Sequence, residues 1–145
     1  MKASTWLRAL AAIMVFFTFG HTMGVFNPPA EGPAGRALDA MRRTHFPIMG
    51  FERSYWDFYR GFGLFVSLEF LFFAAIAYQL SVISRRSPSA TMPLMVTLEI
   101  ACVATAVLSF MYFFAAPMVT SLVAVVCATG ALAALRRDAR LEARA

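Results

Sequence analysis

Three ionisable side chains lie within long apolar stretches of the sequence: His21, Glu69 and Glu99. An ionisable group in the hydrocarbon of a membrane is costly, so each one marks a functional site unless a structural role explains it. A histidine and a carboxylic acid in an apolar pocket are suited to acid–base chemistry, because a neutral carboxylic acid can protonate a double bond or an epoxide. We therefore take His21 and Glu69 as candidate catalytic residues. Interhelical hydrogen bonding is the alternative role.

These ionisable groups fall into two layers along the helices that must carry them. At a rise of about 1.5 Å per residue, His21 and Glu69 lie about 22 Å and 21 Å from the same membrane face, and they meet if both point inward. Glu99 lies only about 10 Å from that face, near the level of Gln79. Because Glu99 shares its helix face with small residues such as Cys102, which favour tight helix contact, we interpret Glu99 and Gln79 as structural polar residues.

The composition places these helices in a membrane. Of the 145 residues, 60% are hydrophobic and 14% are charged, whereas a soluble domain carries about 25% charged residues. A helix that crosses a hydrocarbon core about 30 Å thick needs about 20 apolar residues. The segments that qualify are residues 6–26, 58–83, 93–115 and 118–135. We predict an all-α integral membrane protein, a four-transmembrane-helix bundle that forms a single membrane domain over residues 1–145.

Two alternatives to this set of spans stay open. Proline cannot continue a helical hydrogen-bond ladder, so Pro117 predicts a turn between the last two spans; one long bent helix, and hence three spans, is the alternative. The first segment could instead be a cleaved signal peptide. It is longer than the usual apolar region of such a peptide and lacks an Ala-x-Ala-like site, which favours a membrane span.

Basic residues at the ends of the apolar segments predict the orientation. The net charge is +5, and Lys2, Arg8, Arg85, Arg86 and the arginine-rich tail at 136–145 all flank such segments. Basic flanks favour the cytoplasmic side, so we expect both termini in the cytoplasm and the loop at 27–57 outside. We expect no nucleic-acid partner, because no basic stripe interleaved with aromatic residues is present.

The outer loop is predicted to contain a short interfacial helix. It opens with NPPAEGP, which we expect to be irregular, and apolar residues then recur at helical spacing over Ala34, Leu38 and Met41. The following Tyr55, Trp56 and Tyr59 are typical of an aromatic belt at the headgroup level. A loop that folds back over the mouth of the bundle is the functional alternative. Asp57 and Arg60, three residues apart on one helix face, predict an ion pair.

The motif GHTMGVF at the end of the first span, followed by PP and then by SYWDFYRGFGLFVS, resembles a group of small four-helix bacterial membrane proteins of unknown function. The resemblance covers the first two helices and the loop between them, about half of the chain. It implies a shared outer-side arrangement of these residues: His21, Thr22, Trp56, Asp57, Tyr59, Arg60 and Gly61. With this resemblance we expect a bacterial inner membrane, but it brings no activity or substrate.

We expect the protein to bind an apolar, lipid-like molecule near the outer side of the bundle. The residues predicted to contact it are Thr22, Trp56, Asp57, Tyr59, Arg60, Phe62 and Phe65. One alternative is an intramembrane acid–base enzyme, an isomerase or cyclase of isoprenoid or sterol-like lipids, that uses His21 and Glu69. Another is a non-catalytic subunit of a larger membrane complex, and a homo-oligomer also stays open. We expect no cofactor and no metal, because no His, Cys, Asp or Glu grouping has metal-ligand spacing.

Overall fold

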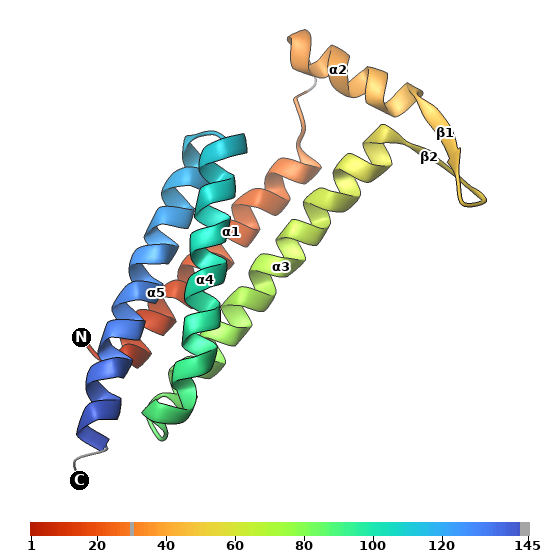
Figure 1. Ribbon diagram of the computed structural model, residues 1–145. Coiled ribbons are helices and arrows are strands. Elements are labelled where there is room, and N and C mark those ends of the chain that lie inside the picture. The colour runs from red at the N-terminus through yellow and green to blue at the C-terminus, as the bar shows by residue number, and fades with distance from the viewer. Residues whose placement is uncertain (30, 143–145) are drawn as a thin grey trace. The chain divides into compact units, whose positions relative to one another are not determined.

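The computed structural model describes residues 1–29 and 31–142, and within these ranges the chain forms five α-helices and one β-hairpin (Figure 1). The elements in chain order are α1 (Ala3–Phe26), α2 (Gly32–Arg43), β1 (His45–Ile48), β2 (Phe51–Ser54), α3 (Tyr55–Ile83), α4 (Pro88–Tyr112) and α5 (Ala115–Glu142). Four of them, α1, α3, α4 and α5, are long and apolar enough to cross a membrane. The predicted all-α fold with four spans is confirmed, and the chain is a multipass membrane protein.

The helix ends differ from the predicted spans mainly around prolines. The predicted break between the last two spans is present, but it lies at residues 113–114, and Pro117 falls in the first turn of α5. A proline costs little there, because the first N–H groups of a helix have no intrahelical partner. For the same reason α4 begins at Pro88 rather than at Pro93. Helix α5 continues through Glu142, so residues 136–142 of the predicted tail are helical.

Contacts divide the chain into two compact units, Met1–Phe17 with Leu71–Ala145, and Thr18–Phe70. In the first unit, α4 and α5 run side by side (Figure 1). Their contact is built from small buried residues, including Cys102, Ala106, Ala124, Cys127 and Ala128. Small residues let helix backbones approach closely in a membrane, where packing rather than the hydrophobic effect holds helices together. Cys102 and Ala106, which share a helix face with Glu99, are both buried.

The second unit consists of the end of α1, helix α2, the hairpin and the first half of α3. A short helix was predicted in the loop between the first two spans, and it is present as α2, whose first turn takes in Gly32 and Pro33 from the stretch expected to be irregular. The hairpin was not predicted. Its two-residue turn places Met49 at φ 50° and Gly50 at φ 84°, and two consecutive positive φ values are the signature of a type I′ turn.

Candidate functional site

A cavity of about 250 Å³ lies where the hairpin meets the first turns of α3. Its lining consists of Arg53 from β2 and of Asp57, Phe58, Gly61, Phe62 and Phe65 from α3. The α3 residues recur every three or four positions, at 57 and 58, then 61 and 62, then 65, so they occupy a single stripe of the helix. Because Gly61 carries no side chain in the middle of that stripe, the helix surface is hollowed there; a Cβ at this position would meet no atom within 4 Å.

The hairpin is oriented so that one of its cations faces this stripe. Phe46 of β1 pairs with Arg53 of β2 in the strand register, and directly paired residues project from the same face of a hairpin. The Phe46 ring stacks on Phe58 at 5.8 Å and lies 4.8 Å from the ring of Tyr55. These ring contacts attach the hairpin to α3 and bring Arg53 to the end of the cavity where α3 begins.

Asp57, at the same end of the cavity, caps helix α3. Its Oδ2 accepts hydrogen bonds from the Ser54 backbone N–H at 2.8 Å and from the Ser54 hydroxyl at 2.9 Å, and its own N–H donates to Ser54 Oγ at 3.2 Å. This reciprocal arrangement is a capping box. Contrary to the prediction, Asp57 and Arg60, both among the described residues, form no ion pair. The Arg60 guanidinium lies 5.0 Å from the centre of the Phe26 ring instead.

Arg53 is the cation of the site. Its Nη1 donates to the backbone carbonyl of Glu52 at 2.8 Å, and its guanidinium lies 5.2 Å from the centre of the Phe51 ring. Among the residues that the structure describes, no carboxylate forms an ion pair with it. A guanidinium with several unused N–H groups is suited to a carboxylate or phosphate, whose oxygens match its fork geometry.

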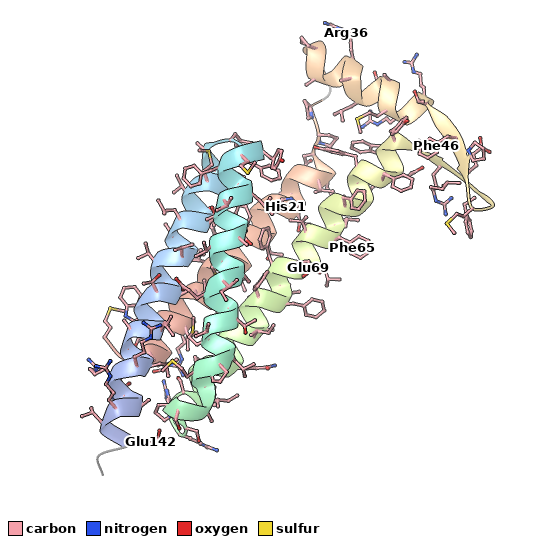
Figure 2. The ribbon with its side chains drawn as sticks, in the orientation of Figure 1. His21, Arg36, Phe46, Phe65, Glu69 and Glu142 are labelled. Carbon is pink, nitrogen blue, oxygen red and sulfur yellow. The ribbon has the colours of Figure 1, made fainter. Side chains whose placement is uncertain are left out.

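Further along α3 from this polar end, the side chains of the stripe are apolar and exposed. Phe58 is 36% exposed, and Phe62 and Phe65 are each 64% exposed. Glu69 follows Phe65 by one helical turn on the same stripe and is also exposed (Figure 2). No hydrogen bond or ion pair reaches its carboxyl group from the described part of the chain. A carboxyl group exposed in a membrane-spanning segment needs a partner that the described chain does not supply.

His21 is bonded to Ser67 rather than to Glu69. The His21 Nδ1 and Ser67 Oγ atoms lie 3.0 Å apart, and Thr22 donates to the same Oγ at 2.8 Å. Ser67 and Glu69 are two residues apart, or about 200° around the helix, so when Ser67 faces α1 the Glu69 side chain projects on the opposite side. His21 and Glu69 were predicted to lie at similar depths and to meet if both face inward. Glu69 does not face α1, so the structure does not contain the predicted pair.

The His21, Thr22 and Ser67 cluster links two helices and leaves no nucleophile exposed. Ser67 is only 7% exposed, and its hydroxyl donates to the carbonyl of Gly63 at 3.3 Å. A hydroxyl has one proton and two lone pairs, so Ser67 Oγ is fully used when His21 and Thr22 both donate to it. Such bonds hold helices together in a membrane. Thr22 therefore lies in this cluster and not on the cavity.

The remaining predicted contact residues belong to a separate aromatic group. Trp56 and Tyr59 stack at 5.6 Å, and the Arg42 guanidinium of α2 lies 4.7 Å from the centre of the Trp56 ring. Neither ring lines the cavity. Of the predicted set, Asp57, Phe62 and Phe65 do line it. Phe58 was not among the predicted contact residues, although its spacing to Phe62 is visible in the sequence. Arg53 was not predicted either, because its position depends on the unpredicted hairpin.

The second polar layer lies in the other unit, between α4 and α5. Thr129 Oγ1 donates to Glu99 Oε1 at 2.6 Å. Glu99 Oε2 is buried and has no hydrogen-bond partner among the described residues. Gln79 on α3 is exposed. Glu99 thus has an interhelical hydrogen bond, the structural role predicted for it. The described residues contain no group of three or more His, Cys, Asp or Glu placed to hold a metal ion.

Comparison of the chain with protein-family models, with curated proteins and with solved structures finds no match. The resemblance to small four-helix bacterial membrane proteins therefore stays a prediction. Function has to be argued from the cavity on α3 and from its chemistry.

Proposed function

We propose that this membrane protein binds an amphipathic, lipid-like molecule in the cavity on α3. One observation carries the proposal: a single groove joins Arg53, a cation that forms no ion pair among the described residues, to a row of exposed phenylalanine rings. The polar or anionic head of the molecule lies at Arg53. Its apolar part lies along Phe58, Phe62 and Phe65, in contact with aromatic faces that otherwise meet membrane lipid.

The place of the groove in the membrane supports a lipid-like ligand. Tyr55 and Trp56 begin α3, and aromatic residues of this kind anchor helix ends at the headgroup level. From Asp57 to Glu69 the helix descends about 18 Å, roughly to the middle of the hydrocarbon core. In a bacterial inner membrane with both termini in the cytoplasm, the side that the basic flanks favour for them, the groove opens to the outer leaflet.

Glu69 favours one alternative, a subunit of a larger membrane complex. Its carboxyl group is exposed on the stripe that continues the groove, and a hydroxyl or amide on a partner helix would satisfy it. A hydroxyl within the apolar part of a bound lipid would do the same. The acid–base enzyme is not proposed, because it requires the His21 and Glu69 pair that the structure does not have.

The headgroup contact is tested by comparing two arginine variants. We expect protein purified in mild detergent to retain one amphipathic molecule in native mass spectrometry, and Arg53→Gln to lose most of it. Arg43→Gln is the matched control, because Arg43 on α2 is exposed and does not line the cavity. Equal retention in the wild type and Arg53→Gln would contradict the proposed headgroup contact. A second protein that co-purifies in fixed proportion, with no retained lipid, would instead support the complex subunit.

A further inference from the structure

A second cavity, of about 430 Å³, lies near the end of α5. Its lining consists of Ala133, Arg136, Arg137, Arg140 and Leu141. The volume is in the range of small-molecule sites, about 300–1,000 Å³. We infer that this cavity, here called the arginine cleft, is a binding site for the headgroup of an anionic phospholipid.

The charges around the arginine cleft leave two guanidinium groups for a ligand. Arg137 is paired with Asp138 at 3.0 Å. The nearby carboxylate of Glu142 accepts a hydrogen bond from the backbone N–H of Ser89 at 3.3 Å, in the first turn of α4. An acid at a helix N-terminus is stabilised by the helix dipole. In the described ranges, Arg136 and Arg140 have no acidic partner.

The spacing of these two arginines suits one phosphate group. Arg136 and Arg140 are four residues apart on a continuous helix, so their side chains leave the same face and can converge. Guanidinium groups bind phosphate oxygens through paired N–H donors, and this is the strongest form of hydrogen bond available to an uncoordinated anion. A phosphate in the cleft would restore charge balance to a region that the protein leaves positive.

The depth of the cleft identifies the phosphate as part of a lipid. Helix α5 begins at Ala115, and Arg136 lies about 32 Å further along the helix axis, close to the thickness of the hydrocarbon core. The cleft is therefore at headgroup level. Ala133 and Leu141 give it apolar walls, which suit the glycerol and upper acyl carbons of a phospholipid and would add nothing for a free phosphate ion. Basic clefts at membrane-helix ends bind anionic headgroups in this way.

The inference is tested in nanodiscs made of equal parts phosphatidylcholine and phosphatidylglycerol. Lipids that remain on the protein after release are counted by native mass spectrometry for the wild type, for Arg136→Gln/Arg140→Gln and for Arg85→Gln/Arg86→Gln. The second double variant is the matched control: it removes the same charge from the turn between α3 and α4, in the same compact unit. All four arginines are exposed, so the changes leave the core intact.

We expect the wild type to retain phosphatidylglycerol in preference to phosphatidylcholine. Losing Arg136 and Arg140 should weaken that retention about 25-fold, or about fivefold per arginine, while the control double variant keeps it. Added inorganic phosphate should not displace the lipid. Equal weakening in both double variants, or no preference in the wild type, would overturn the site. Displacement by inorganic phosphate would overturn the assignment to a lipid and indicate a soluble anion.

Discussion

At the scale of single residues, the membrane-embedded polar groups divide into those that the protein satisfies and those that it does not. His21 and Thr22 are bonded to Ser67, and Glu99 is bonded to Thr129. A polar group within a bilayer is stabilised by such partners. Glu69 has none among the described residues, and Arg53 forms no ion pair there. The second oxygen of Glu99, Oε2, also lacks a partner but is buried. Glu69 and Arg53 lie on or beside one groove, which is why we assign function to that groove.

Ser67→Ala tests the partner of His21. The variant removes the oxygen to which both His21 and Thr22 are hydrogen-bonded, and at about 0.6 kcal/mol for each interhelical bond we expect a loss of about 1 kcal/mol. Thermal unfolding in detergent measures it. Glu69→Gln should leave the unfolding temperature unchanged, because no described residue bonds to that carboxyl. If instead Ser67→Ala leaves the unfolding temperature unchanged and Glu69→Gln lowers it, the partner of His21 is Glu69 and not Ser67.

Thr129→Val tests the second polar layer. It removes the hydroxyl that donates to Glu99 Oε1 and leaves both carboxyl oxygens without a described partner. We expect a loss of about 0.6–1.7 kcal/mol in the free energy of unfolding. In a Glu99→Met background the same change should cost nothing further, since a double-mutant cycle isolates the pair. An equal cost in both backgrounds would show that Thr129 acts through packing alone.

At the scale of the helices and the hairpin, close packing depends on positions where a side chain would not fit. A Cβ on Gly130 of α5 would lie 2.7 Å from atoms of the Trp6 indole on α1. An aromatic ring held between helices cannot withdraw as the end of a flexible side chain can. The contact of α1 with α5 in this unit therefore requires glycine at position 130.

Gly130→Ala is expected to destabilise the protein by about 1–3 kcal/mol, because it forces the Trp6 ring out of its place. Gly20→Ala is the matched control: the same substitution in a helix, at a position where a Cβ would meet no atom within 4 Å. Chemical denaturation in mixed micelles compares the two. If Trp6→Leu does not relieve the cost of Gly130→Ala, the steric explanation is wrong.

The structural elements also show what the sequence could predict. The spans of α1 and α3 and the interfacial helix α2 were predicted, because apolar length and helical spacing are local properties of the chain. The hairpin was missed, since its turn has Met49 where asparagine or aspartate is the usual signal and Pro47 interrupts a strand. Without the hairpin, Arg53 could not be placed at the groove.

At the scale of the whole molecule, composition predicted the membrane and the number of spans, but it could not predict which face of each helix turns inward. His21 and Glu69 were given similar depths from the helical rise alone, and the structure then joins His21 to Ser67. The depth of a residue in the membrane follows from its position along the helix, whereas the direction in which its side chain points depends on packing against other helices. In an apolar sequence nearly every face is hydrophobic, so the sequence pattern holds little information about facing.

The most direct test of the account fills the groove on α3 without changing its polar groups. Gly61→Leu places a side chain in the hollow of the stripe, and Gly24→Leu on α1 makes the same change where a Cβ also meets no atom within 4 Å. Native mass spectrometry of both variants should show the retained amphipathic molecule lost from Gly61→Leu and kept by Gly24→Leu. Equal retention by the two variants would contradict a binding site in this groove.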